Sequence, residues 1–385
     1  MSAASDEKNA LLLGTNKLGW QDRISRFPTS LLILLTILTL GGLFVLYSAV
    51  GGSGNGDYVW RQAARFGVGL ALMFSIAMFG GEKIYRRYAY LLYAIALLLL
   101  IVVFLTGSIG MGARRWLALG FLNLQPSELM KVTMVLALAR YFHDRSFSQG
   151  IGFTNLFVPL LMILLPTALI IKQPDLGTSI LLVAVGMVVI VAAGLKWKVF
   201  IAVLSMIAAS LPLGWNMMHE YQRRRILTLF SPEKDPLGAG YHIIQSKIAI
   251  GSGGIFGKGF MAGSQSQLNF LPERHTDFIF SVLAEEWGFV GGLLLLSIYC
   301  LIILRTLIIA TMASDRFGLL TVVGLTALFG FQVLVNMGMV IGLLPVVGIP
   351  LPMISYGGSS MLTLMIAMGL MARVSIYSKQ HGRTI

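Results

Sequence analysis

The chain has 385 residues, of which 56% are hydrophobic and 12% are charged. Soluble domains carry roughly 25% charged residues, so this composition excludes an ordinary soluble protein. The formal net charge is +13, but the sequence has no long basic tract and no zinc or RNA-binding motif, which excludes nucleic acid as a partner.

Ten apolar segments follow one another and predict an all-α integral membrane protein. Crossing about 30 Å of hydrocarbon takes roughly 20 residues, and these runs are continuous, whereas strands of a membrane barrel alternate. The predicted spans are 29–48, 64–81, 88–107, 127–143, 153–171, 177–194, 198–215, 277–303 and two more within the uncharged segment 317–372, which a Gly- and Pro-rich stretch at 342–358 divides.

Ten spans place both termini on one side, and the positive-inside rule selects the cytoplasm. The short loops on that side hold most of the basic loop residues, among them Lys83, Arg86, Arg87, Arg140, Arg145, Lys196 and Lys198. We therefore expect a cytoplasmic tail at 1–28, a single transmembrane domain at 29–377 and a second cytoplasmic tail at 378–385. The long polar segment 216–276, between spans 7 and 8, is expected outside.

The first polar group, Arg114-Arg115-Trp116, precedes span 4. Guanidinium groups suit phosphate oxygens, so the pair is a candidate phosphate clamp. The alternative is an interfacial anchor of basic and aromatic residues.

Span 4 opens with Gln125-Pro126-Ser127 and then carries Glu128 and Lys131. Residues three apart share a helix face and can pair. Because a charged side chain at mid-span costs about 2.5–3.5 kcal/mol, we favour a functional pair. The alternative is a structural ion pair at the helix start, with the acid favoured by the helix dipole.

The loop Lys172–Thr178 contains Asp175. Taken alone, Asp175 is best explained as part of a turn and a cap for span 6. It becomes a functional candidate only if it faces the same cavity as Asp277.

The outer segment holds an amphipathic stretch with Lys247 on its polar side, which we interpret as an interfacial helix. The glycine-rich run Gly251–Gly259 lacks the spacing of a P-loop and no strand precedes it, so we expect a flexible loop and no nucleotide cofactor. The run Arg223–Arg225 is interpreted as a solvated basic segment at the membrane surface.

The densest polar cluster is Glu273-Arg274-His275-Thr276-Asp277, directly before span 8. Ionisable groups beside a membrane span mark a working site by default. A helix cap at Thr276 or Asp277 is the structural alternative, but it explains neither the neighbouring charges nor Glu285 and Glu286 deeper in the span.

A last segment, Pro350–Ser360, precedes span 10. It is either a loop with a helix cap or a helix N-terminus whose amides face an anion. The sequence leaves these two interpretations open.

Together these motifs resemble the SEDS family (shape, elongation, division and sporulation). The resemblance rests on Leu271–Glu286, Gln125–Glu128, Gln173–Gly177 and Gly342–Ser360, and it covers nearly the whole chain. Within the family, Glu273-Arg274-His275 and Gln265–Phe270 are similar to the elongation branch, since the division branch usually has Ala where Arg274 stands.

The resemblance implies a peptidoglycan glycosyltransferase that polymerises lipid II at the outer face of the bacterial plasma membrane during elongation and rod-shape maintenance. It implies a class B penicillin-binding protein as the transpeptidase partner, within a larger elongation complex. The family's essential aspartate maps onto Asp277, its cavity acid and base onto Glu128 and Lys131, and its loop aspartate onto Asp175.

In that reaction the acceptor hydroxyl attacks the donor sugar and displaces polyprenyl diphosphate with inversion. Asp277 is the expected base, with His275 beside it in the substrate site. Candidate cations for the diphosphate are Arg114, Arg115, Lys131, Lys247 and Arg274. A divalent cation, Mg²⁺ or Mn²⁺, is a further expectation without a sequence signature. The alternatives are a lipid II flippase or other lipid-linked sugar transporter, and a non-catalytic scaffold.

Overall fold

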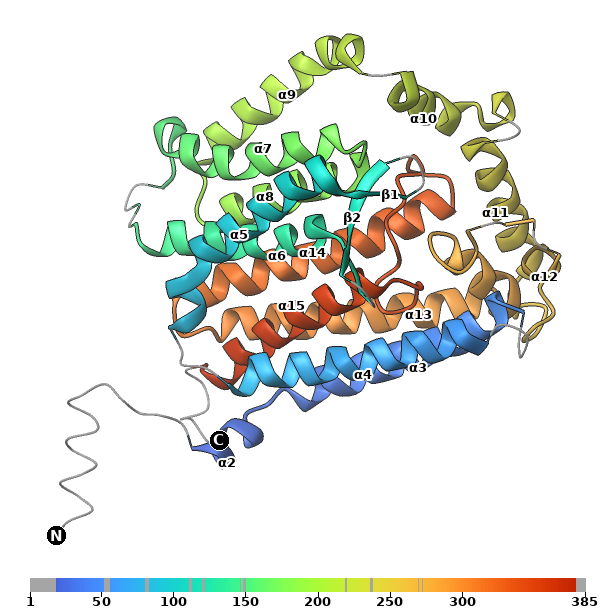
Figure 1. The fold of residues 1–385 in the computed structure, drawn as a ribbon, viewed down its shortest axis with the longest axis horizontal. Coiled ribbons are helices and arrows are strands. Elements are labelled where there is room, and N and C mark those ends of the chain that lie inside the picture. Colours follow the sequence, from blue (N-terminus) through green and yellow to red (C-terminus); the bar gives the residue numbers. More distant parts are fainter. Residues whose placement is uncertain are drawn as a thin grey trace.

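The computed structural model describes residues 19–51, 56–79, 83–110, 113–119, 122–145, 147, 150–218, 220–235, 238–268, 270–271 and 273–378. The predicted terminal tails fall mostly outside these ranges. The described residues form a bundle of long helices, with N- and C-terminal ends close together at one end (Figure 1).

The bundle is built from helices that match the predicted segments. They are α2 (Trp20–Ser25), α3 (Thr29–Ala49), α4 (Gly56–Met78), α5 (Ile84–Thr106), α6 (Pro126–His143), η2 (Phe153–Leu156), α7 (Phe157–Lys172), α8 (Leu176–Ala192), α9 (Trp197–Met217), α10 (Glu220–Phe230), η3 (Pro232–Lys234), α11 (Ala239–Gly253), α12 (Ser264–Gln267), α13 (Ile279–Thr311), α14 (Arg316–Val340) and α15 (Gly358–Ile376). Each of the ten predicted spans coincides with a helix, namely α3 to α9 and α13 to α15.

Six of these helical segments are long and apolar enough to cross a membrane: α3, α5, η2 with α7, α13, α14 and α15. The protein is therefore a mostly helical, multi-pass membrane protein. Charged residues interrupt α4 and α6, and α8 is only 17 residues long. The total of ten spans stays a prediction.

Helices α6 and α14 lie at the centre of the bundle. Nearly every side chain of α6 is buried, because α5, α8, α14 and α15 pack around it. In a bilayer such a helix is shielded from lipid on all sides. Its charged residues therefore face protein, where partners can satisfy them.

The expectation of an all-α fold missed a small antiparallel sheet. Strands β1 (Ser108–Gly110), β2 (Ala113–Leu119) and β3 (Leu122–Leu124) pair in the order β1-β2-β3. Strands β1 and β3 have only three residues each, and the seven residues of β2 do not alternate between apolar and polar, so the sequence gives no strand signal. The sheet lies at the end of the bundle away from the termini (Figure 1).

The glycine-rich segment after α11 was expected to be a flexible loop, but its backbone is bonded to α13. Lys258 N donates to Glu285 O at 3.0 Å, and Phe289 N donates to Gly254 O at 2.9 Å. These bonds replace those that α13 loses at Gly288, where the helix breaks with φ 65° and ψ −160°. Helix α13 is thus two helical pieces joined through this loop.

Helix α11 was predicted to lie at the membrane interface, but one of its faces packs against other helices of the bundle. Ile243, Ser246 and Ala249 are buried, and this stripe faces α13 and α14. Ile248 is apolar but exposed beside Lys247. The sequence pattern missed this because Ser246 is polar but fully buried, where it hydrogen-bonds Ser281 of α13 at 2.9 Å.

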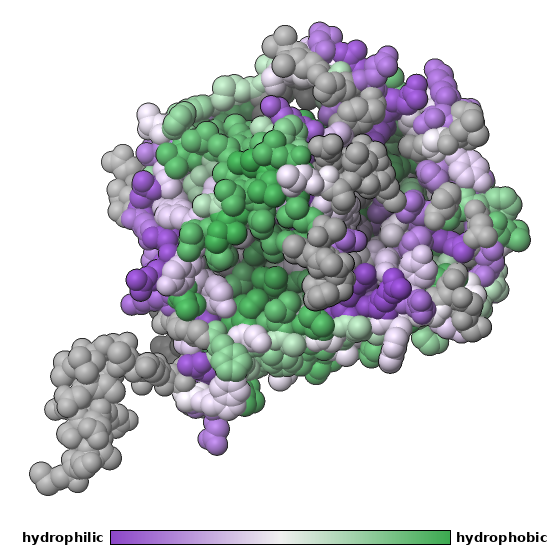
Figure 2. Space-filling view, viewed as in Figure 1, coloured by the Kyte–Doolittle hydropathy of each residue, from purple (hydrophilic) through white to green (hydrophobic). Residues whose placement is uncertain are grey.

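Polar surface gathers at the two ends of the bundle, and an apolar band separates them (Figure 2). One end carries the chain termini and the loop before α14. The other carries the sheet, α10, α11 and α12 (Figure 1). This is the distribution that a bilayer around the band would select.

Replacing Gly288 by Ala should destabilise the protein. A Cβ at this position would lie 2.3 Å from Gly257 N, and the backbone conformation is nearly restricted to Gly, at a strain of about 1–3 kcal/mol. The expected result is a lower midpoint of thermal unfolding in detergent. Gly41→Ala is the matched control, since its Cβ would meet nothing within 4 Å, and equal midpoints for both variants would contradict the prediction.

Candidate functional site

Polar segments that are distant in sequence meet at the end that carries the sheet. Arg115 of β2 donates from Nε to Gln173 O at 3.1 Å, which ties the sheet to the α7–α8 loop. Ser359, near the start of α15, donates to Asn123 O at 2.6 Å. Helices α6, α8 and α15 thus all begin beside the sheet.

The turn before α13 is held by the segment before α15. Tyr356 N donates to His275 O at 2.9 Å. Ser355 Oγ donates to Thr276 O at 2.6 Å. Two successive carbonyl groups of the turn therefore accept hydrogen bonds from the same neighbouring segment, the one before α15.

A buried asparagine fixes the next carbonyl. Asn336 of α14 is fully buried, and its Nδ2 donates to Asp277 O at 2.9 Å and to Ile349 O at 2.8 Å. The carboxylate of Asp277 points at the turn containing Gly348, where a Cβ would lie 3.4 Å from Oδ2. Asn336 therefore holds the backbone of Asp277 and the backbone next to Gly348, which the Asp277 carboxylate faces.

Asp277 does not cap α13, which removes the structural alternative for this residue. The residue at the N-cap is Phe278, and no side chain caps the helix. Asp277 is partly buried, and desolvation together with the nearby carboxylate of Glu273 raises its pKa to about 6, while Arg225 acts in the opposite direction. A carboxyl group with this pKa exchanges its proton close to neutral pH.

The two residues before Thr276 are affected by burial as well. Desolvation lowers the pKa of His275, although Glu273 opposes it, and it also lowers the pKa of Arg274. His242 of α11 lies nearby, with its ring 5.7 Å from that of Phe278. Burial lowers the pKa of His242 too, so both imidazoles favour the neutral form.

Glu128 and Lys131 form the ion pair that the sequence predicted. Lys131 Nζ lies 2.7 Å from Glu128 Oε1, and both side chains are almost completely buried. The second carboxylate oxygen of Glu128 has no hydrogen-bond partner within the described residues. The N-cap of α6 is Gln125, whose backbone N–H donates to Ser359 Oγ at 3.2 Å, so the pair lies just inside the polar end.

Asp175 acts as the N-cap of α8. Its Oδ1 accepts from Thr178 N at 3.2 Å and its Oδ2 accepts from Thr178 Oγ1 at 2.9 Å. The helix start lies close to the site, because a Cβ at Gly177 would meet Val347 O at 2.7 Å. Asp175 therefore lies beside the backbone turn that Asp277 faces. Both of its carboxylate oxygens already accept hydrogen bonds from Thr178.

The remaining cationic candidates are less closely placed. Lys247 is exposed and packs over Gly342. Arg115 also donates to Pro174 O, so it fastens the sheet to the α7–α8 loop. The side chain of Arg114 lies outside the described part of the chain.

Glu285 and Glu286 are explained by the loop after α11. Glu285 is fully buried and accepts from Lys258 Nζ at 2.8 Å and from Gln265 N at 3.0 Å. Glu286 accepts from the hydroxyl of Ser48 on α3. These carboxylates fasten the loop and α3 to the first piece of α13, next to the turn that carries Asp277.

Sequence reasoning missed several residues that shape the site. Asn336 lies in an uncharged span, and Arg225 was assigned to a solvated basic run. Tyr58 and Gln62 belong to the first turns of α4, which begins before the predicted span. A polar residue inside an otherwise apolar run, as at Asn336, is the one signal that was available.

Metal binding has no preformed cluster here. Among the described residues, no three side chains of His, Cys, Asp or Glu gather as metal ligands. Glu273 and Asp277 supply two carboxylates on one turn. That set fits Mg²⁺ only if substrate phosphates and water complete its shell, as is usual for this ion.

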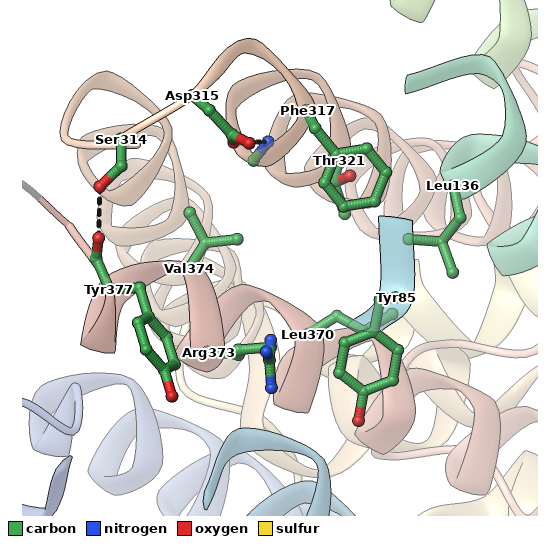
Figure 3. Close-up of a pocket in the computed structure, with 11 residues that line it drawn as sticks. Tyr85, Leu136, Ser314, Asp315, Phe317, Thr321, Leu370, Arg373, Val374 and Tyr377 are labelled. Atoms are coloured by element: carbon green, nitrogen blue, oxygen red, sulfur yellow. Dashed lines mark hydrogen bonds between the residues drawn. The ribbon is translucent and has the colours of Figure 1, made fainter. Parts of the chain in front are cut away.

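A small pocket of about 40 Å³ lies at the opposite end of the bundle and is lined by charged residues such as Asp315 and Arg373 and by apolar residues such as Leu136 and Leu370. Figure 3 shows Arg373 between the rings of Tyr85 and Tyr377, at 4.7 and 5.2 Å from their centroids. Arg373 lies 15 residues beyond Gly358, where α15 begins beside the site, which is about 22 Å along the helix at 1.5 Å per residue. Asp315 Oδ1 accepts from Gly318 N at 2.8 Å and caps α14. The charged residues of this pocket therefore hold the ends of neighbouring helices together.

Comparisons with known proteins identify the relatives of the chain. The family model of the FtsW, RodA and SpoVE group, described as "Cell cycle protein", matches residues 28–380. Peptidoglycan glycosyltransferase MrdB of Escherichia coli is 44% identical, over 96% of this chain and 99% of that protein.

Solved structures agree with that family. A chain from a structure titled "Structural coordination of polymerization and crosslinking by a peptidoglycan synthase complex" is 35% identical, with a TM-score of 0.79 over 92% of this chain and 99% of the other. The crystal structure of the rod shape determining protein RodA of Thermus thermophilus is 31% identical, with a TM-score of 0.69 over 92% of this chain and 98% of the other.

Removing Lys131 should destabilise the protein more than removing the whole pair. Lys131→Met leaves the carboxylate of Glu128 buried without its cation, a change that costs about 3–5 kcal/mol. The double variant Glu128→Gln/Lys131→Met should recover most of that loss. Chemical or thermal unfolding in detergent measures both, and a double variant less stable than Lys131→Met would contradict this account.

Proposed function

This chain belongs to the FtsW, RodA and SpoVE family of cell cycle proteins, and from that membership we propose that it is a peptidoglycan glycosyltransferase of the RodA type. Its substrate would be lipid II, polymerised into glycan strands during cell elongation and rod-shape maintenance. The observation that carries the assignment is Asp277, a partly buried carboxyl group with a raised pKa at the point where distant polar segments converge.

Asp277 would act as the base of glycosyl transfer. The acceptor hydroxyl attacks the anomeric carbon of the donor sugar, the bond to the diphosphate oxygen breaks, and the configuration inverts. The hydroxyl proton passes to the carboxylate of Asp277 during the attack. A base works best when its pKa lies near the operating pH, and about 6 meets that condition.

The leaving diphosphate carries charge that the protein must stabilise. Arg274 adjoins the base in sequence, and Arg225 of α10 is close enough to Asp277 to oppose the rise in its pKa. We assign these two guanidinium groups to the diphosphate, with Arg115 and the N-terminus of α15 nearby. Glu128 and Lys131 lie deeper, where they would orient the substrate as a neutralised pair.

The polyprenyl tail would lie in an apolar cavity between α4, α5, α6 and α15. This cavity has a volume of about 250 Å³, and Figure 2 shows apolar side chains on the face that carries α5. Leu129 and Val132, which line it, are neighbours of Glu128 and Lys131 on α6. A tail held there would bring its diphosphate toward the polar end.

We also propose that Mg²⁺ or Mn²⁺ assists when substrate is present. Asp277 and Glu273 would hold it together with diphosphate oxygens, and the ion would neutralise charge on the leaving group. Asp175 is the weaker candidate, because both of its oxygens already accept hydrogen bonds. Loss of polymerisation in EDTA, restored by Mg²⁺, is the test.

The outer side of the membrane is the proposed location of the site. Among the short loops, basic residues are concentrated at the opposite end, including Arg86, Arg87, Arg140, Arg145 and Arg316, which favours that end as cytoplasmic. A class B penicillin-binding protein is the proposed partner, supplying transpeptidase activity, and co-purification from detergent extracts tests this pairing.

Two other functions are alternatives to an enzyme: a lipid II flippase and a non-catalytic scaffold. A lipid II flippase needs polar groups that are reachable from both faces, whereas the candidate residues gather at one end. A non-catalytic scaffold would tolerate loss of Asp277. The polymerisation assay below separates both from an enzyme.

Asp277→Asn should abolish glycan polymerisation. The amide cannot accept the hydroxyl proton, and removal of a general base lowers rates by about 10²–10⁴-fold. The purified protein with its partner would be given lipid II, and the glycan products would be separated by size. Asp144→Asn at the opposite end is the control, and wild-type activity in Asp277→Asn would refute the assignment.

Polymerisation should lose activity as the pH falls through about 6. Above this pH the carboxylate of Asp277 is ionised and can accept a proton, whereas below it the group is protonated. The rate measured at saturating lipid II between about pH 3 and 8 should therefore show a fall on the acid side centred near pH 6. A fall centred near 4, the ordinary range of aspartate, would show that burial does not tune this base.

A further inference from the structure

Three aromatic side chains lie beside the turn that carries Asp277, and the mechanism above does not use them. The ring centroid of Tyr58, on α4, is 5.1 Å from that of Tyr356 and 5.5 Å from that of His275. The rings of His275 and Tyr356 are 6.1 Å apart. The three form one cluster although they come from three separate segments.

The cluster is open to solvent on one side. Tyr58 is 38% exposed, and Tyr356 and His275 are each only partly buried. A ring that packs against two others and still keeps this exposure presents apolar surface to whatever occupies the polar end. Trp60, two residues away on α4, is 79% exposed and belongs to none of these ring pairs.

Hydrogen bonds hold α4 against the segment before α15. Gln62 is buried, its Nε2 donates to Ser355 O at 3.0 Å, and its Oε1 accepts from Gly357 N at 3.5 Å. The guanidinium of Arg65 lies 4.6 Å from the ring centroid of Tyr356. The cluster is thus fixed in place before any ligand arrives, which lowers the entropy lost on binding.

The cluster is also fixed relative to the proposed base. His275 precedes Asp277 by two residues, and two residues span at most about 7 Å. Tyr356 binds the same turn through its backbone, with N donating to His275 O at 2.9 Å. A ligand resting on these rings therefore lies against the turn that carries Asp277.

We propose that Tyr58, His275 and Tyr356 form a saccharide-binding surface that positions the acceptor sugar beside Asp277. Pyranose rings present C–H groups on their faces, and the negative face of an aromatic ring attracts such partly positive groups. The sugar hydroxyls at the ring edge then remain free to meet the base. This inference rests on the proposed glycosyltransferase function and names the site of its acceptor.

Tyrosine and tryptophan also gather at membrane–water boundaries as simple anchors. An anchor would need neither ring contacts to the turn before α13 nor a buried glutamine that locks α4 to it. Trp60 has the properties of an anchor, and Tyr58 does not. The two residues therefore form a matched pair on one helix.

The test compares Tyr58→Leu with Trp60→Leu in the lipid II polymerisation assay. Leucine keeps apolar bulk but removes the ring, and an aromatic contact of this kind accounts for about a three- to ten-fold change in binding. Tyr58→Leu should raise KM for lipid II by that factor with kcat little changed, and Tyr58→Phe should restore it. Trp60→Leu should leave KM unchanged.

Equal KM values for Tyr58→Leu and wild type would overturn the saccharide surface while leaving the proposed function intact. If wild-type protein makes no glycan at all, the proposed function itself fails. Equal increases in KM for Tyr58→Leu and Trp60→Leu would show that both residues act as membrane anchors, which also overturns the proposal.

A binding measurement covers the case in which Tyr58→Leu does not fold. Saturation-transfer NMR would be recorded on full-length Asp277→Asn with a short peptidoglycan oligosaccharide that has no lipid or diphosphate. Saturation of aromatic protons should transfer to the sugar C–H groups, and Tyr356→Leu should weaken that transfer. Absence of transfer in Asp277→Asn would refute the surface without reference to activity.

Discussion

Hydrogen bonds to the backbone carbonyls of one turn are the constraint on which the site depends. At the edge of a membrane, an unpaired buried carbonyl costs several kcal/mol, so a non-helical turn needs partners from elsewhere. Asn336, Ser355 and the backbone of Tyr356 supply them to three successive residues. The result is an aspartate whose backbone cannot shift without breaking bonds to two other segments.

The break in α13 follows the same rule. Gly288 interrupts the helix, and the loop after α11 takes over the lost backbone bonds. Glu285 then neutralises Lys258 of that loop at 2.8 Å. The first piece of α13 begins just after Asp277, so these bonds hold the turn that carries the base against the bundle. The buried carboxylates of Glu285 and Glu286 therefore have a structural role.

The charged side chains have different partners in the middle of the bundle and at its two ends. Lys131 and Glu128 are tolerated in α6 because other helices surround it and because they neutralise each other. At the end with the chain termini, Arg373 lies between aromatic rings and Asp315 pairs with Arg86 at 3.4 Å. One end therefore holds charges that join helices, whereas the other holds acids and bases that remain partly accessible to a substrate.

The sequence by itself determined the mostly helical class, the positions of the long apolar segments and the polar cluster that ends at Asp277, because hydrophobic runs and isolated ionisable groups are local properties. It could not decide that Asn336 supports Asp277 or that Tyr58 lies against His275. Those facts depend on which segments meet across the bundle. Only the tertiary structure decided them, since hydrogen bonds and ring contacts between residues far apart in the chain leave no periodic signal in any one segment.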